Sequence, residues 1–181
     1  VSHDGTFVAN DIDSHWYSPN SFGNYNGAGG VTLNGDADND GADGTLTVHN
    51  IDTHLEGGAS QKWFANGGDV TISGYLSVSI YSIDTHHLSL NSVNSSARGG
   101  NVSVTGIAGN IDIAGGINLD IQSTNSSVKD GSLTLESGLQ ILLGELDMDK
   151  VSSASLDPVV DSTIDKLLSF DTTAGSGSGA T

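Results

Sequence analysis

Three copies of one tetrapeptide place a carboxylate two residues before an imidazole. The copies are Ile12–His15, Ile51–His54 and Ile83–His86, and each reads Ile-Asp-Ser/Thr-His. If the isoleucine faces inward in an extended chain, alternation turns both the aspartate and the histidine outward on the same side. Stacked copies would then form an outward ladder made of Asp13, His15, Asp52, His54, Asp84 and His86.

This ladder has two interpretations. Carboxylates stacked about 4.8 Å apart repel one another, and a metal ion or a protonated histidine beside them would relieve that repulsion. The ladder would then be a metal site or a seam for self-association. Alternatively, each aspartate occupies a corner and accepts hydrogen bonds from local backbone N–H groups. We favour the corner, because metal sites usually require ligands that converge from several directions.

An acidic stretch between the first two copies resembles part of a calcium-binding loop. Its residues match positions one, three, five and six of an EF-hand at Asp36, Asp38, Asp40 and Gly41. The stretch is not an EF-hand, because Thr47 stands where the bidentate glutamate of position twelve belongs. Backbone carbonyls and water could complete a weak calcium site, and the alternative is a solvated acidic turn. The predicted calcium ligands are Asp36, Asp38, Asp40 and Asp43.

Two pairs of aromatic residues stand out in a chain with few aromatics. Trp63-Phe64 falls at the turn position that Ser95-Ser96 and Ser126-Ser127 occupy in later repeats, and Trp16-Tyr17 lies near the N-terminal end. Exposed aromatic pairs suggest subunit contacts or platforms for sugars, and the alternative is that they cap the core. The predicted interface residues are Trp16, Tyr17, Trp63 and Phe64.

Each tetrapeptide opens a longer repeat that must position these side chains. Units 51–74 and 83–106 align without a gap, and a fourth copy maps Leu88–Gly106 onto Leu119–Ser137. Apolar and polar residues alternate between turns rich in Gly, Asn and Ser, which predicts short strands. Repeats of about thirty residues suit the coils of a solenoid. The sequence therefore predicts an all-β parallel β-helix of about four to five coils.

The alignment also predicts which residues stack. The first core column is Val31, Val70, Val102 and Leu133, and the second is Leu33, Ile72, Val104 and Leu135. The Gly-Gly pairs before them are expected to supply positive φ at corners. The outward face between the columns would carry Thr32, Thr71, Ser103 and Thr134.

The two ends of the chain differ from the repeats. Residues 1–11 are predicted to form an N-terminal cap or arm, and 12–156 the solenoid. Asp157-Pro158 is typical of a helix start, and Val159, Ile164 and Leu167 continue an apolar stripe, so 157–170 is predicted to be a capping helix. Residues 171–181 form a Gly/Ser-rich tail, which we expect a neighbouring subunit to hold.

Composition and charge narrow the functional class. The net charge is −17 with only five Lys plus Arg, which argues against nucleic acid or an anionic membrane as partner. No segment is apolar for long enough to span a bilayer, and the absence of cysteine excludes disulfides. The chain begins at Val1, which leads us to expect a mature, secreted product, extracellular or on the cell surface.

The repeats resemble those of filamentous-haemagglutinin-type exoproteins and related bacterial surface adhesins. The resemblance lies in polar turns followed by Gly-Gly-Asn/Asp-Val and a short alternating strand, as in 95–104, 66–72 and, more weakly, 129–135. It covers roughly residues 12–150 and implies a right-handed parallel β-helix, export and a surface role. The N-terminal secretion domain of those exoproteins is not recognisable here.

These features predict a structural protein that is not an enzyme. Polysaccharide-degrading β-helices use acids and bases across coils, but this chain has few basic groups to hold an acidic substrate. We expect a subunit of a self-assembling surface filament or matrix, which contacts itself by head-to-tail packing or strand addition. The alternatives are a fragment of a large adhesin and a monomeric ice- or glycan-binding solenoid, with surface glycans as partner.

Overall fold

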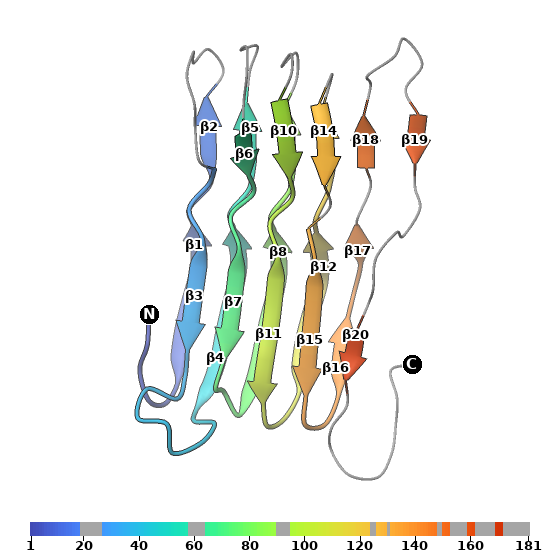
Figure 1. Ribbon diagram of the computed structural model, residues 1–181. Helices are drawn as coiled ribbons and strands as arrows, with labels where there is room; N and C mark the ends of the chain where they lie inside the picture. The colour runs from blue at the N-terminus through green and yellow to red at the C-terminus, as the bar shows by residue number, and fades with distance from the viewer. Residues whose placement is uncertain are drawn as a thin grey trace.

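The protein is built almost entirely of parallel strands that stack into four sheets. The computed structural model describes residues 1–18, 27–57, 64–89, 95–123, 126–129, 131–147, 150–152, 159–161 and 169–171. Across these residues every strand pair is parallel except β18 with β19. Strands that follow one another along the chain belong to different sheets, so the chain runs around a coil and then begins the next one beside it (Figure 1). The prediction of an all-β parallel solenoid is confirmed.

Sheets I and II form one wall of the coil. Sheet I contains, in order, β1 (Phe7–Asp13), β4 (Thr45–Asp52), β8 (Ser77–Asp84), β12 (Ile111–Asn118) and β16 (Ile141–Leu143), and β17 (Leu146–Asp147) also pairs with β12. Sheet II contains β2 (Trp16–Ser18), β5 (Leu55–Gly57), β9 (His87–Ser89), β13 (Ile121–Ser123), β18 (Lys150–Ser152) and β19 (Val159–Asp161).

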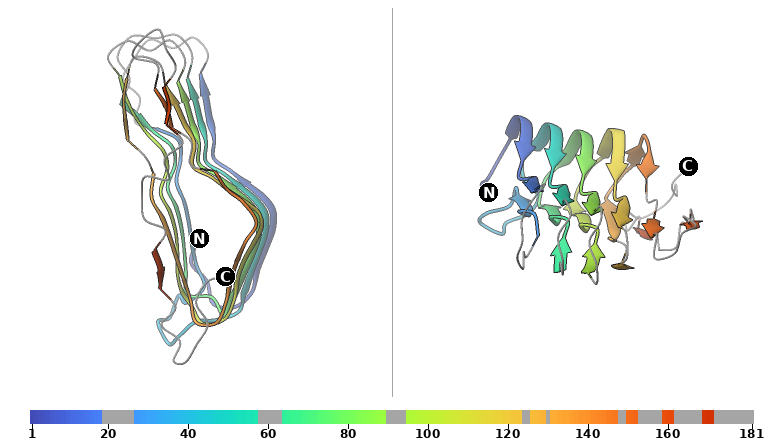
Figure 2. Two further views of the ribbon diagram at one scale, coloured as in Figure 1. Left: turned by 90° about the vertical axis from the view of Figure 1, so that its right-hand side faces the viewer. Right: turned by 90° about the horizontal axis from the view of Figure 1, so that it is seen from above.

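Sheets III and IV form the opposite wall (Figure 2, left). Sheet III contains β6 (Phe64–Asn66), β10 (Ser95–Arg98) and β14 (Ser126–Lys129). Sheet IV contains β3 (Val31–Asn34), β7 (Val70–Ser73), β11 (Val102–Ile107), β15 (Leu133–Ser137) and β20 (Ser169–Asp171).

The core consists of aliphatic columns between sheets I and IV. The pairing places Val31, Val70, Val102 and Leu133 in one register and Leu33, Ile72, Val104 and Leu135 in another, and all eight are buried. Both predicted columns are therefore confirmed. Between them the hydroxyl side chains of Thr32, Thr71, Ser103 and Thr134 pair in register on the outward face.

The two walls meet at a waist formed by Thr53 and Gly68 and, one coil on, by Thr85 and Gly100. The Gly68 N–H donates to the Thr53 carbonyl at 2.9 Å, and the Thr53 hydroxyl donates to the Gly68 carbonyl at 2.7 Å. The next coil repeats both contacts at 3.3 and 3.4 Å. A buried threonine thus satisfies the glycine carbonyl. This explains two positions of the repeated tetrapeptide, since the isoleucine lies in the core and the threonine at the waist.

The Gly-Gly pairs are required by close approach and not by backbone conformation. A Cβ on Gly68 would lie 2.2 Å from the Gly29 carbonyl oxygen, and a Cβ on Gly100 would lie 2.3 Å from that of Gly68. Neither glycine has a positive φ, so the prediction that these pairs supply positive φ is wrong. Positive φ occurs instead at Gly74 and Gly106, where β7 ends and within β11.

The acidic or amide residue after each Gly-Gly pair links one coil to the next. Oδ1 of Asp69 accepts the Asn101 N–H at 2.8 Å, and Oδ1 of Asn101 accepts the Ser132 N–H at 3.0 Å. Arg98 also forms an ion pair with Asp69 at 2.9 Å. This side chain to backbone ladder explains the Gly-Gly-Asp/Asn pattern without invoking a ligand.

Two sequence expectations differ from the structure. The repeat alignment predicts that Leu88 pairs with Leu119, but Leu88 pairs with Gln122, and the expected spacing returns only at Ser95 with Ser126. That part of the alignment is wrong because the chain between β13 and β14 is shorter than the chain between β9 and β10. Alternation of apolar and polar residues predicts that Leu76, Val78 and Ile80 all face the core, but Leu76 is exposed, whereas Val78 and Ile80 are buried.

The predicted capping helix over 157–170 is not confirmed. Of this segment the structure describes Val159–Asp161, which is strand β19, and the first part of β20. The β-branched pair Val159-Val160 suits a strand. The remainder of the segment and the tail after Asp171 lie outside the described residues. No helix in the described part of the chain could cross a membrane.

Candidate functional site

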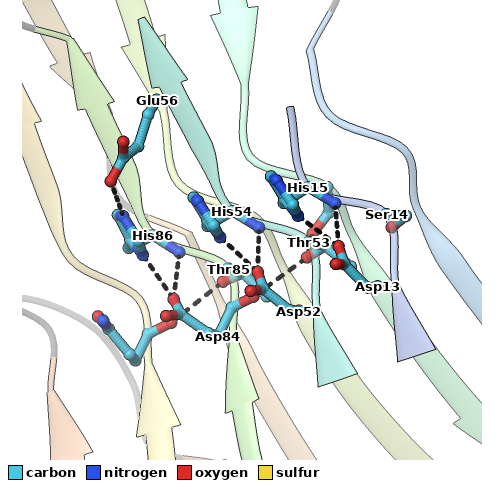
Figure 3. Close-up of polar contacts among 12 residues, drawn as sticks. Asp13, Ser14, His15, Asp52, Thr53, His54, Glu56, Asp84, Thr85 and His86 are labelled. Carbon is cyan, nitrogen blue, oxygen red and sulfur yellow. Dashed lines mark hydrogen bonds and ion pairs between the residues drawn. The ribbon is translucent and has the colours of Figure 1, made fainter. Parts of the chain in front are cut away.

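The repeated tetrapeptides place aspartate and histidine in one column outside the waist. Asp13 pairs with Asp52, and Asp52 pairs with Asp84. In each copy Oδ1 of the aspartate accepts the backbone N–H of the histidine two residues later at 3.1 Å. The same oxygen lies 2.5, 2.5 and 2.7 Å from the histidine Nδ1 in the three successive copies (Figure 3). The aspartate therefore forms the local corner and also holds the ring.

The three imidazoles stack face to face along the column. The ring centroids of His15 and His54 lie 4.8 Å apart with an angle of 2° between the planes, and those of His54 and His86 lie 4.6 Å apart with an angle of 5°. These separations match the spacing of adjacent strands, so the backbone register sets them. The rings stand in a row above the three carboxylates (Figure 3).

The carboxylates favour the charged form of His15 and His86. Burial lowers the pKa of His86, but the hydrogen bond to Asp84 and the charges of Asp84, Glu56 and Asp52 outweigh it, so the pKa is raised. Burial likewise raises the pKa of Asp84, and its contacts with His86 outweigh that effect and lower it. At the outer end of the column the hydrogen bond to Asp13 raises the pKa of His15.

The column continues into the next coils with different side chains. Asn118 pairs with Asp84 on one side and with Asp147 on the other. Asn118 also accepts the Asp120 N–H through Oδ1 at 2.9 Å, so Ile117–Asp120 repeats the corner with an amide and a carboxylate. A hollow of about 350 Å³ beside His86 is lined in part by Asn118, Asp120 and Gln122. Ile117–Asp120 does not match the Ile-Asp-Ser/Thr-His pattern, and its signal in the sequence is an isoleucine followed by polar residues one and three positions later.

Glu56 and His87 are further residues that sequence reasoning missed. Glu56 lies in β5, and its Oε1 is 3.9 Å from Nε2 of His86. His87 points inward between Leu55 and Ile121, and only 1% of it is exposed. Its Nδ1 has no hydrogen-bond partner among the described residues. Burial and the neighbouring His86 lower the pKa of His87 to about 4. Its burial could have been predicted from the alternation of side chains along a strand, because His86 faces outward and the next residue must then face inward.

The acidic stretch brings its aspartates together, with one addition. Carboxylate oxygens of Asp36, Asp38 and Asp40 lie within 4.8 Å of one another, and Asp38 and Asp43 form a second such group with Asp4. Asp4 comes from the N-terminal arm and accepts the backbone N–H groups of residues 37 and 38. The charge of Asp38 is the main cause of a raised pKa at Asp40. These contacts are equally those of a solvated acidic turn, so calcium stays a prediction.

We expect the substitution Asp38→Asn to raise the melting temperature in a chelator at low salt, because it removes the carboxylate shared by both groups. Millimolar calcium should then raise the melting temperature of the wild-type chain and leave the variant nearly unchanged. Thermal melts with EDTA or calcium measure both effects, and Asp112→Asn, outside the acidic stretch, is the control. A calcium-independent wild-type melt would identify a solvated turn.

The predicted aromatic interface is described in part. Trp16 is partly buried and packs with Ala28 against Leu55, which favours a role in capping the core. Tyr17 is exposed. Phe64 lies in β6 and pairs with Ser96, as the repeat alignment predicts, although in a strand and not in a turn. Trp63 and the side chain of Phe64 lie outside the described residues.

Comparison of this chain with family models, with curated proteins and with solved structures found no match. The resemblance to haemagglutinin-type repeats therefore remains a prediction from the sequence.

Proposed function

We propose that this chain is an extracellular structural protein, a subunit of a self-assembling surface filament or matrix. On this proposal it is a right-handed β-helix of four to five coils with no catalytic role, and its main partner is another copy of itself. The observation that carries the proposal is the regular strand edge of sheet I. Strand β1 has no neighbour on its outer side among the described residues. Its residues 7–13 pair with residues 46–52 of β4, which pair in turn with residues 78–84 of β8, and this regular pairing continues up to the bulge in β12.

Half-buried apolar side chains accompany this edge. Phe7, Ala9 and Ile12 pack against the core, but each is more exposed than its partner in the next coil. At the other end of sheet I, Ile141, Leu143 and Leu146 are likewise only partly buried. Stacking one end on the other would bury both sets and continue the sheet in a head-to-tail contact that repeats without closing. The same edge would carry further coils if the chain belongs to a longer adhesin stalk.

The orientation of the edge can be worked out from a neighbouring strand. Val78 donates its N–H to Asn110 of the following coil, and Val78 pairs with Leu46, which pairs with Phe7. Alternation along a parallel strand then turns the N–H of Val8 toward the outer edge. The side chain of Val8 is exposed. Proline at this position would remove a donor needed for assembly and none needed for the fold.

We expect the wild-type chain to form fibres with a regular axial repeat, and Val8→Pro to abolish them while remaining folded. Val8→Ala keeps the N–H and is the matched control, so it should assemble like the wild type. Electron microscopy and sedimentation velocity at rising concentration measure assembly, and circular dichroism checks the fold. Equal fibre formation by Val8→Pro and Val8→Ala, or a wild-type chain that stays monomeric at high concentration, would contradict the proposal.

A second candidate, a monomeric ice- or glycan-binding solenoid, is favoured by the outward hydroxyl face. Thr32, Thr71, Ser103 and Thr134 stand in register along sheet IV. Retention of a monomeric chain on ice or on an immobilised glycan, lost on Thr71→Val, would favour this candidate over the filament.

A further inference from the structure

We propose that His54, His86 and Glu56 form a zinc site that joins two neighbouring coils. His54 follows β4, His86 follows β8, and Glu56 lies in β5 (Figure 3). One possible ligand atom from each side chain lies within 4.8 Å of those from the other two. The inference concerns one subunit and does not depend on filament assembly.

The hydrogen bonds of the column decide which ring nitrogen is available to a metal. Nδ1 of His54 lies 2.5 Å from Oδ1 of Asp52, and Nδ1 of His86 lies 2.7 Å from Oδ1 of Asp84. An ionised carboxylate can only accept hydrogen bonds, so Nδ1 must carry the proton. In the neutral ring Nε2 then keeps its lone pair. For His86 this nitrogen faces Glu56 Oε1 at 3.9 Å.

Each of the two histidines already has the carboxylate partner that metal-binding histidines have in other proteins. A carboxylate that accepts the second ring N–H fixes the tautomer and orientation of a histidine ligand and makes its other nitrogen more basic. Asp52 and Asp84 have this role, and each is itself anchored by a backbone N–H at 3.1 Å. The two rings consequently stand parallel within 5°.

The donor set favours zinc over calcium. Two imidazole nitrogens and one carboxylate oxygen, with a fourth position for water, are ligands that zinc takes in proteins, whereas calcium takes six to eight oxygens. Ligand atoms around a tetrahedral zinc ion lie about 3.3 Å apart, so the side chains must draw together and the rings must turn toward the ion. The exposed fractions of these side chains, 16% for His54, 20% for His86 and 36% for Glu56, allow that movement.

Titration of zinc into the chelator-stripped full chain tests the site. We expect one zinc ion per chain by calorimetry, shifts of the His54 and His86 imidazole signals by nuclear magnetic resonance, and a higher melting temperature. Glu56→Gln should lower the affinity at least tenfold, because it replaces an anionic ligand with a neutral amide of the same shape. Asp84→Asn should lower it by about 10–100-fold through His86.

The matched control is His49→Gln, which removes an exposed imidazole that stacks on Tyr81 and belongs to no cluster of this kind among the described residues. It should bind zinc like the wild type. Circular dichroism confirms that each variant folds, and Glu56→Gln is the safest because its side chain is partly exposed. Wild-type affinity in Glu56→Gln, an equal loss in His49→Gln, or imidazole shifts that spare His54 and His86 would overturn the proposal.

Discussion

Gly100→Ala is expected to destabilise the protein by about 3 kcal/mol, the upper end of the usual range for an overpacked interior. The added Cβ would lie 2.3 Å from the Gly68 carbonyl oxygen and 2.8 Å from Cβ of Thr85. Neither can yield, because the carbonyl belongs to the neighbouring coil and Thr85 is buried at the waist. The two coils must therefore separate locally. In a chain of this size the melting temperature should fall by about 6–12 °C.

Gly29→Ala is the matched control for this prediction. Gly29 is the corresponding glycine of the first coil, and the atoms nearest to a Cβ there would be those of the Ser14 side chain and carbonyl, at 3.3 Å or more. Alanine also restricts the unfolded chain, so we expect a change within about 0.5 kcal/mol. Chemical denaturation of both variants gives the comparison. Similar losses of stability at the two positions would show that close packing at the waist does not govern these glycines.

The register of the first three coils was predictable because Val31, Val70 and Val102 each follow the isoleucine of their tetrapeptide by the same number of residues. The stacking of Val70 on Val102 and of Asp52 on Asp84 follows from that constancy. The fourth coil was harder, since Ile117–Asp120 keeps the shape of the corner but replaces Asp by Asn and His by Asp. The repeat is recognised in the sequence by the identity of its residues, whereas the fourth corner keeps only the backbone geometry of the other three.

Contacts that join distant parts of the chain could not be found from the repeat. Asp4 reaches the acidic stretch because residues 1–3 run beside β3, and no pattern in the sequence predicts that pairing. Glu56 likewise meets His86 across coils only because β5 and β9 lie next to each other. The prediction for the Gly-Gly pairs is wrong because a glycine required for close approach and one required for positive φ look the same in a sequence.

His87→Leu is expected to stabilise the protein, by an amount that grows as the pH falls. His87 stands in a core column between Leu55 and Ile121, with its Nδ1 unpartnered among the described residues. Leucine extends the aliphatic column and removes the buried polar atom, which should raise the free energy of unfolding by about 1 kcal/mol at pH 7. Urea unfolding at pH 7 measures this first effect.

The larger effect follows from the lowered pKa of His87. Burial and His86 shift it from 6.5 to about 4, so the folded chain keeps this ring neutral at pH values where the unfolded chain protonates it. Protonation of His87 in the unfolded chain favours unfolding. The neutral buried ring therefore does not reduce the free energy of unfolding above pH 6.5, and the free energy of unfolding falls as the pH drops from 6.5 toward 4. That loss amounts to about 3 kcal/mol in the wild type and is absent from His87→Leu. Protonation of other side chains occurs in both proteins and cancels in the difference between them.

The measurement is therefore the difference in unfolding free energy between His87→Leu and the wild type, recorded in EDTA from pH 7.5 to pH 4. We expect this difference to widen steadily below pH 6.5. His49→Gln removes an exposed histidine instead and should follow the wild-type profile throughout. A difference that stays constant over the whole range would contradict the prediction, because it would mean that the folded chain protonates His87 as readily as the unfolded chain does.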